Sequence, residues 1–283
     1  LIALLGGCTS TSVTEKYQDK RNDIINVKDK VIEFETGNVL IGSVSRLYMS
    51  NKCLLIADHK SVDKQIHIFN KNDFSYLTSI GNFGEGPEEI TVMGCLAIDE
   101  AHHQLYVSDH AKQKIFSYDM DSVMVDSLYK PQVKTAMNET LFPSEYQYIN
   151  DTLSIAVLIK PTSTSTFNQF LGRWNMNTGE MIPMKYTHPD IQKKRITFAA
   201  SEKAGIYVEC YTRHDLMTIC SLDGELLYNI YGPDWDGGNG NKLQSFGTVM
   251  IGNDKIFVSY CMPEILFRQR FWSLIWKGII LKP

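Results

Sequence analysis

The chain has 283 residues, of which 43% are hydrophobic and 21% are charged, and its formal net charge is −4. This apolar fraction can supply a sizeable core, so the composition excludes disorder over most of the chain. The slight acidic excess provides no basic surface of the kind that binds nucleic acid, and we expect no nucleic-acid partner.

The first ten residues, LIALLGGCTS, end an apolar run with two glycines directly before Cys8. An aliphatic residue, two small residues and a cysteine form the lipobox pattern, in which the cysteine thiol takes a diacylglyceryl group and the small residues admit the signal peptidase. We therefore expect residues 1–8 to be a lipoprotein signal remnant with its lipidation site at Cys8. The alternative is an ordinary apolar strand that contains a cysteine by chance.

Residues 9–30, which begin TSTSVTEKYQDKRND, are expected to form a polar tether between the lipid and the folded body. No later stretch reaches the roughly 18 apolar residues that a membrane-spanning helix needs. We therefore expect an outer-membrane lipoprotein that is held at the membrane by its lipid and does not cross it. Thr9 and Ser10 begin no acidic run, which favours the periplasmic side over the cell surface.

Residues 31–283 contain a repeat. Five apolar, β-branched and aromatic segments typical of buried strands are spaced by 51, 48, 53 and 50 residues, with starts at 54, 105, 153, 206 and 256. In most of them a polar turn and a second strand follow. Four antiparallel strands in each unit of about fifty residues are typical of a β-propeller blade. The sequence thus predicts an all-β propeller domain of four-stranded blades, and a sandwich or barrel with irregular strand spacing is the alternative.

The segments LYVSD (105–109) and KIFSYD (114–119), with the Gly-rich connection GNFGEGPEEI (81–90), resemble six-bladed propellers of the NHL and TolB-like type. More narrowly, a lipobox followed by LIGSVSRLYMSNKCLLIAD (40–58) resembles the propeller lipoproteins of gut Gram-negative anaerobes. The resemblance covers about residues 30–265 and implies a lipid-anchored, six-bladed propeller. It implies no activity, because one fold supports many functions.

The last blade of the six-bladed pattern is expected to be incomplete. Six blades of about fifty residues need roughly 300 residues after the tether, more than the chain provides. The resemblance implies that a strand such as VIEFE (31–35) closes the last blade, and the chain ends with FWSLIWKGIILKP (271–283). Three interpretations stay open: a truncated or frame-shifted sequence, an open or five-bladed ring, and a membrane-associating tail.

With Cys8 lipidated, an odd number of cysteines remains, so they cannot all pair. Cys210 and Cys220 are expected on neighbouring strands, with an offset too large for a disulfide. We expect Cys53, Cys95 and the other remaining cysteines to be small buried hydrophobic residues.

The polar loops at one end of the blades carry the candidate site. In a blade with strands A to D, the B–C turns and the D–A connections lie on the same face. Asp58 and His59 occupy the same B–C position as Asp109 and His110, and Glu85 lies in the D–A connection between these two blades. The plainer interpretation is that each aspartate forms an Asx-turn and that each histidine is an exposed turn residue.

A later blade repeats this arrangement with different residues. Arg213 and His214 occupy its B–C turn, and Trp235 lies in its Gly-rich D–A connection, GPDWDGGNGN (232–241), as the best candidate for an exposed aromatic side chain. Together with the earlier loops, these residues predict a shallow, polar, aromatic-edged surface that binds a glycan or a peptide.

The sequence contains no recognisable catalytic or cofactor motif. GNFGEGP is neither a P-loop nor a dinucleotide fingerprint, no nucleophile elbow is present, and the two Asp-His pairs lack the spacing of a zinc motif. We therefore predict a non-enzymatic, lipid-anchored binding or scaffold module for a protein or glycan partner, without a cofactor. The alternative is a propeller hydrolase or lyase with a metal, such as calcium, in its central channel. A third hypothesis is a truncated product without a closed ring.

Overall fold

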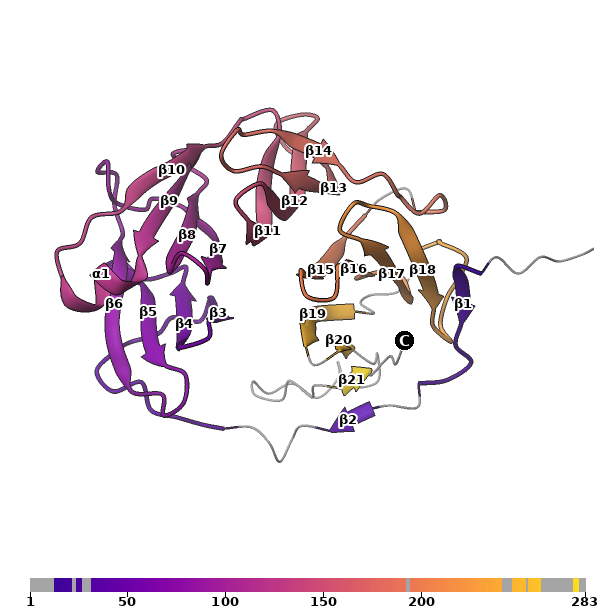
Figure 1. Cartoon of the computed structure of the whole chain (residues 1–283), viewed down its shortest axis with the longest axis horizontal. Coiled ribbons are helices and arrows are strands. Elements are labelled where there is room, and N and C mark those ends of the chain that lie inside the picture. Colours follow the sequence, from indigo (N-terminus) through magenta and orange to yellow (C-terminus); the bar gives the residue numbers. More distant parts are fainter. Residues whose placement is uncertain are drawn as a thin grey trace, which may run out of the picture. The chain divides into compact units, whose positions relative to one another are not determined.

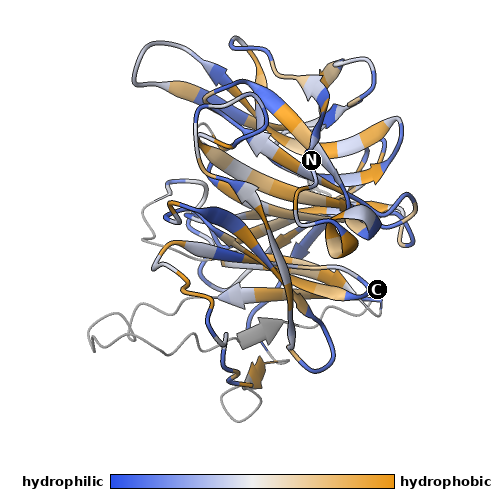
Figure 2. Ribbon diagram, turned by 90° about the vertical axis from the view of Figure 1, so that its left-hand side faces the viewer, coloured by the Kyte–Doolittle hydropathy of each residue, from blue (hydrophilic) through white to orange (hydrophobic). Residues whose placement is uncertain are grey.

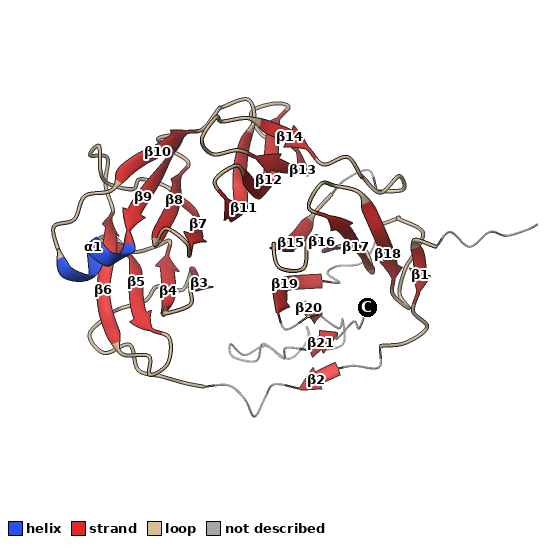
Figure 3. Ribbon diagram, in the orientation of Figure 1, coloured by secondary structure: helices blue, strands red, loops and turns tan. Residues whose placement is uncertain are grey.

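The computed structural model describes residues 13–21, 24–26, 32–191, 194–240, 246–252, 254–260 and 277–279. Strands dominate this part of the chain, with one short helix, as Figures 1 and 3 show. The chain divides into two compact units, which are described separately. The central unit is Val31–Met184, and the terminal unit combines Leu1–Lys30 with Lys185–Pro283.

The central unit consists of three four-stranded antiparallel sheets, and the strand order within each sheet follows the chain. The first sheet is β3 (Ser45–Met49), β4 (Cys53–Asp58), β5 (Lys64–Asn70) and β6 (Tyr76–Asn82). The second is β7 (Met93–Asp99), β8 (Gln104–Asp109), β9 (Lys114–Asp119) and β10 (Gln132–Ala136), with α1 (Met120–Val125) between β9 and β10. The third is β11 (Phe142–Asn150), β12 (Leu153–Pro161), β13 (Phe167–Trp174) and β14 (Met181–Pro183).

The terminal unit contains a fourth sheet of the same kind, with β15 (Ile196–Ser201), β16 (Ile206–Tyr211), β17 (Leu216–Ser221) and β18 (Leu226–Tyr231). β1 (Glu15–Tyr17) adds a fifth strand, parallel to β18. Two antiparallel strand pairs complete the described part of this unit: β19 (Phe246–Gly252) with β20 (Lys255–Tyr260), and β2 (Ile24–Asn26) with β21 (Lys277–Ile279).

Neighbouring sheets in each unit pack face to face and share a core. Leu55 and Ile66 of the first sheet pack in one buried cluster with Leu105 of the second. In the terminal unit, Val208 of β16 shares a cluster with Val258 of β20. The other face of β4 is covered by the segment that contains Phe34 and Val39, so all six residues of β4 are buried and all but Asp58 are apolar. In Figure 2, hydrophobic residues accordingly lie along the strands and hydrophilic ones in many of the loops.

Part of the segment expected to be a tether is folded into the terminal unit. β1 pairs with β18, and the guanidinium group of Arg21 forms a buried ion pair with Asp215. The interpretation of 9–30 as solvated throughout fails because its charged residues find partners that are remote in the sequence. Cys8 lies outside the described residues, so the expected lipidation site stays a prediction.

The strand that pairs with the C-terminal part of the chain differs from the one expected. Residues 32–35, within the VIEFE segment, are not in a strand, and β2 instead pairs with β21. The C-terminal residues 261–276 and 280–283 lie outside the described part of the chain. The incompleteness of the last blade and a membrane-associating tail therefore stay predictions.

The cysteine prediction is confirmed for the four cysteines that the structure describes. Cys53, Cys95, Cys210 and Cys220 are all buried and form no disulfide. In the β16–β17 register Cys210 faces Met217, and therefore Cys220 lies three residues further along β17. At about 3.3 Å per residue, this offset exceeds the reach of a disulfide.

Candidate functional site

The Asp109 carboxylate at the end of β8 binds backbone amides and is fully buried. Its Oδ2 accepts the N–H of Thr91 at 2.8 Å, and its Oδ1 accepts that of Val92 at 3.2 Å. The same Oδ1 accepts the N–H of Ala111 at 3.0 Å, which makes an Asx-turn. Asp109 therefore joins the B–C turn of the second sheet to the connection that arrives from the first.

Asp58 does the same at the end of β4. Its Oδ1 accepts the N–H of Lys60 at 2.9 Å, and its Oδ2 accepts the N–H of Gly42 at 2.7 Å. Only 2% of Asp58 is exposed. The structure thus favours the plainer interpretation of both aspartates, because their oxygens are used to hold loops and are not presented to a ligand.

The two histidines that follow these aspartates are not the exposed turn residues that we expected. The Nδ1–H of His59 donates to the carbonyl of Met93 in β7, 3.2 Å away. The ring of His110 packs edge-on against Phe142 of β11, with 6.0 Å between ring centroids. Burial lowers the pKa of both imidazoles. Each histidine ring therefore contacts the first strand of the next sheet.

Glu85 is the one exposed side chain among the candidate residues of the central unit. Lys112, in the turn after β8, holds the loop that carries Glu85. Its Nζ donates to the carbonyls of Gly86 at 2.7 Å and Glu89 at 2.6 Å. The N–H of Gly86 also donates to the Glu89 carboxylate at 2.7 Å. The predicted D–A connection therefore meets the B–C turn of the second sheet, as the propeller arrangement requires.

In the terminal unit, the loop that follows β18 holds Trp235 in an aromatic cluster. Its ring centroid lies 4.9 Å from Tyr231, 5.7 Å from His188 and 6.0 Å from His214. His214 also packs against Tyr211 at 6.2 Å. Trp235 is thus half-buried, and less accessible than its Gly-rich loop suggested. We call these five residues the aromatic cluster.

Hydrogen bonds fix the orientation of the rings in this cluster. The Tyr231 hydroxyl donates to Oε2 of Glu15 in β1 and accepts the Nε2–H of His188 at 2.9 Å. Nδ1 of His188 accepts the N–H of Asp190 at 3.3 Å. Tyr17 stacks on Tyr231 with ring centroids 4.6 Å apart. The N-terminal strand therefore braces one side of the cluster.

Arg213 and His214 are adjacent in the chain but lie in opposite environments. Arg213 is exposed, whereas His214 is 5% exposed and its ring is inside the aromatic cluster. Nδ1 of His214 lies 3.9 Å from Oδ1 of Asp236, beyond hydrogen-bond distance. Burial lowers the pKa of His214 despite this nearby carboxylate. In this turn the Arg213 guanidinium is exposed to solvent, whereas the neighbouring His214 imidazole is buried and neutral.

Asp215, the next residue, ties the turn to the rest of the terminal unit. Its carboxylate pairs with Arg21 and accepts the N–H of Asp234 at 3.0 Å. A Cβ at Gly232 would lie 2.2 Å from the Asp215 carboxylate, so only glycine fits there. The Arg21 guanidinium also lies over the Tyr260 ring, 3.9 Å from its centroid. The loop around Trp235 is therefore anchored at its first residues.

The sequence did not point to His188, Glu15, Tyr17 or Arg21 as neighbours of this surface. His188 lies in a non-repeating segment, and the other three lie in the stretch interpreted as a tether. Their partners are far away in the chain: 194 positions separate Arg21 from Asp215, and 216 separate Glu15 from Tyr231. No local spacing signal could have found these contacts.

A second cluster, also missed by sequence reasoning, joins two A–B turns of the central unit. Nδ1 of His102 lies 2.8 Å from Oδ2 of Asp99 and 3.9 Å from Oδ1 of Asp151. The three ligand atoms lie within 4.8 Å of one another, and a nitrogen with two carboxylate oxygens is a donor set that suits Zn²⁺. Asp99 already accepts the His102 backbone N–H and the Tyr106 hydroxyl. The alternative of a calcium ion in a central channel stays untested.

Residues 9–171, more than half of the chain, match a family described as a 6-bladed beta-propeller, DUF5128. The chain belongs to this family. Membership, together with the four-stranded sheets, confirms the all-β propeller that the repeat predicted. The DUF5128 match carries no activity of its own, and the narrower resemblance to TolB-like lipoproteins stays a prediction.

Solved structures agree on the fold. A protein of Bacteroides fragilis, named as exported, superposes with a TM-score of 0.53 at 15% identity, over 88% of this DUF5128 chain and 73% of its own. A member of the DUF4221 family from Bacteroides vulgatus superposes with a TM-score of 0.51 at 10% identity, over 93% of this chain and 68% of its own. At this identity the likeness shows the fold alone.

No curated protein matches the DUF5128 chain. In the part of the chain that the structure describes, no helix is both long enough and apolar enough to cross a membrane.

Proposed function

We propose that this DUF5128 propeller is a non-enzymatic binding module, and that its partner docks on the surface formed by the turn at Arg213 and the loop of Trp235. One observation carries the proposal. The exposed Arg213, which forms no ion pair with a described residue, directly precedes His214, and the ring of His214 packs against the braced, half-buried Trp235 with 6.0 Å between ring centroids.

A protein is the partner that this surface fits best. Arginine, tryptophan and tyrosine are the residues that most often dominate the binding energy of protein interfaces. Arg213, Trp235 and the 68% exposed Tyr17 supply all three types within the terminal unit. The aromatic rings are packed before binding, so ordering them on association costs little entropy. A glycan is the alternative partner.

We further propose that the module is attached to the inner face of the outer membrane through a lipid at Cys8. The lipobox pattern around Cys8 supports this anchor. Labelling cells with a palmitate analogue should mark the protein, and Cys8→Ala should abolish the label and release the protein from the membrane. Labelling that persists in the Cys8→Ala variant would contradict the anchor without affecting the binding proposal.

The binding surface is tested by charge reversal. Arg213→Glu should lower the recovery of a co-purifying envelope protein at least tenfold, as expected for a hot-spot residue. Lys203→Glu is the matched control, because Lys203 is an exposed residue of the same sheet in the turn between β15 and β16. Equal recovery with both variants would refute the surface. Capture of a glycan that Arg213→Glu abolishes would replace the protein partner.

A further inference from the structure

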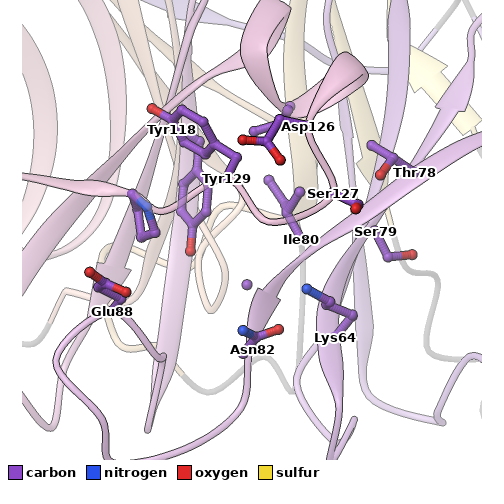
Figure 4. A pocket seen from close by; sticks show the side chains of 13 residues that line it. Lys64, Thr78, Ser79, Ile80, Asn82, Glu88, Tyr118, Asp126, Ser127 and Tyr129 are labelled. Carbon is purple, nitrogen blue, oxygen red and sulfur yellow. The ribbon is translucent and has the colours of Figure 1, made fainter.

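The central unit contains a small hollow where α1 and the segment after it cover β6 (Figure 4). It offers water-sized groups about 20 Å³. A water molecule needs roughly 10–15 Å³ by that measure, so the hollow admits one water and no larger ligand. The side chain that can respond to its surroundings lies in the terminal unit instead, in the aromatic cluster.

His214 has a buried ring nitrogen without a hydrogen-bond partner. Only 5% of the residue is exposed, and its Nδ1 forms no hydrogen bond with a described residue. Oδ1 of Asp236 lies 3.9 Å from this nitrogen, about 1 Å beyond the length of a charge-assisted hydrogen bond. A buried polar atom without a partner costs free energy, and a shift of about 1 Å would supply the partner here.

The other imidazole of the aromatic cluster is in the opposite situation. His188 is also buried, but its Nε2–H donates to the Tyr231 hydroxyl at 2.9 Å and its Nδ1 accepts the N–H of Asp190 at 3.3 Å. A proton added to Nδ1 of His188 would face that N–H and break the hydrogen bond. The Nδ1 of His214 has no such bond to lose, so His214 is the imidazole of the cluster that can take up a proton.

The charged groups around His214 act in both directions. Burial lowers its pKa, Asp236 raises it and Arg213 lowers it further. His188, from the segment before β15, also faces His214 and stays neutral through its two hydrogen bonds. Because burial has the largest effect, the His214 imidazole is neutral near pH 7 and takes up its proton in mild acid. The other titratable groups on the surrounding elements are Asp190, Asp215, which pairs with Arg21, Asp234, which accepts the Tyr260 hydroxyl, and the phenols of Tyr211 and Tyr231.

The part of the loop that carries Asp236 has the freedom to follow the proton. Gly237 and Gly238 come directly after Asp236, and their φ angles are +71° and +88°, a region that glycine enters without strain. The first residues of the loop are held by Asp215, so a movement is confined to residues 235–240. Trp235 precedes Asp236 in the chain and packs against His214, so a shift of Asp236 changes the packing of the indole.

We propose that protonation of His214 switches the surface of Arg213 and Trp235 between two states. In the neutral state the ring of His214 packs against Trp235 and Tyr211 and holds the indole in place. In the protonated state its Nδ1–H donates to Asp236, residues 235–240 shift by about 1 Å, and the indole loses part of its packing. The consequence, weaker partner binding in mild acid, rests on the proposed function, whereas the shift is a property of this chain alone.

The switch is tested on the purified full-length chain without a partner. NMR spectra of the imidazole nitrogens, assigned with His214→Gln, give the midpoint of protonation. Indole fluorescence reports the loop, and it should fall between about pH 7.5 and about pH 5, because an imidazolium quenches a neighbouring indole more strongly than an imidazole does. Trp235→Phe and His214→Gln should each remove this change. Far-UV circular dichroism should stay constant over the same range, which shows that the chain remains folded.

Substitutions of the two charged neighbours should move the midpoint in opposite directions. Asp236→Asn keeps the shape of the side chain and removes its charge, so the midpoint should fall by about half a pH unit or more. Asp223→Asn, at an exposed aspartate in the turn between β17 and β18, is the matched control and should leave the midpoint unchanged. Arg213→Ala should raise the midpoint, by a smaller amount because the guanidinium is exposed to solvent.

The consequence for binding is measured by the recovery of the co-purifying envelope protein. For the unmodified chain, recovery should fall at least about fivefold between about pH 7.5 and about pH 5.5. For His214→Gln it should stay nearly constant, because glutamine does not take up a proton.

Three results would overturn the proposal: the fluorescence change persists in His214→Gln, Asp236→Asn leaves the midpoint of His214 unchanged, or recovery falls equally for His214→Gln and the unmodified chain. If no partner is recovered at either pH, the proposed function fails, and the NMR and fluorescence titrations still decide whether the loop switches.

Discussion

The B–C turn has different roles in the central and terminal units. In the central unit, β4 and β8 each end in a buried aspartate, and its carboxylate is saturated by the amides of the neighbouring loop. In the terminal unit the last residue of β16 is Tyr211, and the turn that follows contributes a buried imidazole and an exposed guanidinium. The first type of turn holds the fold together, whereas the second also exposes a cation.

The comparison shows why a repeated motif is a poor guide to a binding site. Asp58 and Asp109 recur because each sheet needs an acceptor for the backbone amides of an adjoining loop. Arg213 departs from the repeat, and it forms no ion pair with any residue that the structure describes. The position that breaks the pattern is therefore the better candidate for function.

The largest effect is expected at Arg21, which attaches the N-terminal segment to the terminal unit. Arg21→Met leaves the Asp215 carboxylate buried without its cation, and we expect the free energy of unfolding to fall by about 3–5 kcal/mol. The exposed Lys20→Met should change it by less than about 0.5 kcal/mol. Urea denaturation measures both. Equal effects of the two variants would mean that residues around Arg21 form a tether after all.

The next largest effect is expected at Asp109 in the central unit. Asp109→Asn places an amide NH₂ opposite one of the backbone N–H groups that the carboxylate accepts, which should cost about 1–3 kcal/mol. Asp63→Asn, at an exposed aspartate between β4 and β5, is the control and should be nearly neutral. If Asp109→Asn is equally neutral in a denaturant titration, the aspartate does not hold the loop.

Because histidines are buried in both units, we expect the free energy of unfolding to fall in mild acid. Burial lowers the pKa of His59, His110 and His214, whereas the unfolded chain keeps an ordinary value of about 6.5. The unfolded state therefore binds more protons, so their contribution is complete above about pH 6.5 and declines as the pH falls below it. Denaturation at about pH 7.5 and about pH 5.5 measures the difference.

Two variants sharpen this pH dependence. His110→Gln should make the acid-induced loss shallower, because one buried titrating group is removed. The pKa of His102 shifts in the opposite direction, because its hydrogen bond with Asp99 raises it. The contribution of His102 to the free energy of unfolding is therefore present below about pH 6.5 and is lost as the pH rises through its folded pKa. His102→Gln should therefore make the loss in acid steeper. The same slope in both variants would show that burial of the histidine rings does not control the response.

The smallest effect on stability is expected at Arg213. Arg213→Ala removes an exposed side chain and should change the free energy of unfolding by less than about 0.5 kcal/mol, while partner binding falls strongly. A large loss of stability would place Arg213 with Asp109 among the residues that hold the fold, and would remove the contrast between the two units.

Local features of the fold were predictable from the sequence. Within each four-stranded unit, paired strands are neighbours in the chain, so the spacing of apolar runs predicted these units, whereas the pairs β1–β18 and β2–β21 join distant segments. The Asx-turns were also predictable, because Asp109 binds the amide only two residues ahead. The buried state of Cys210 followed from its place in an apolar strand.

The repeat, the strands and the local turns follow from the amino-acid sequence, because hydrogen bonds between adjacent strands and within turns depend on nearby residues. Which loop side chains are saturated with hydrogen bonds and which are exposed depends on contacts between distant segments. Arg21, Glu15 and His188 reach their partners through packing between distant segments, and burial decides whether a charged or aromatic side chain holds the fold or faces a partner. Whether a carboxylate is fully hydrogen-bonded depends on every neighbour in space, and sequence spacing does not encode that set.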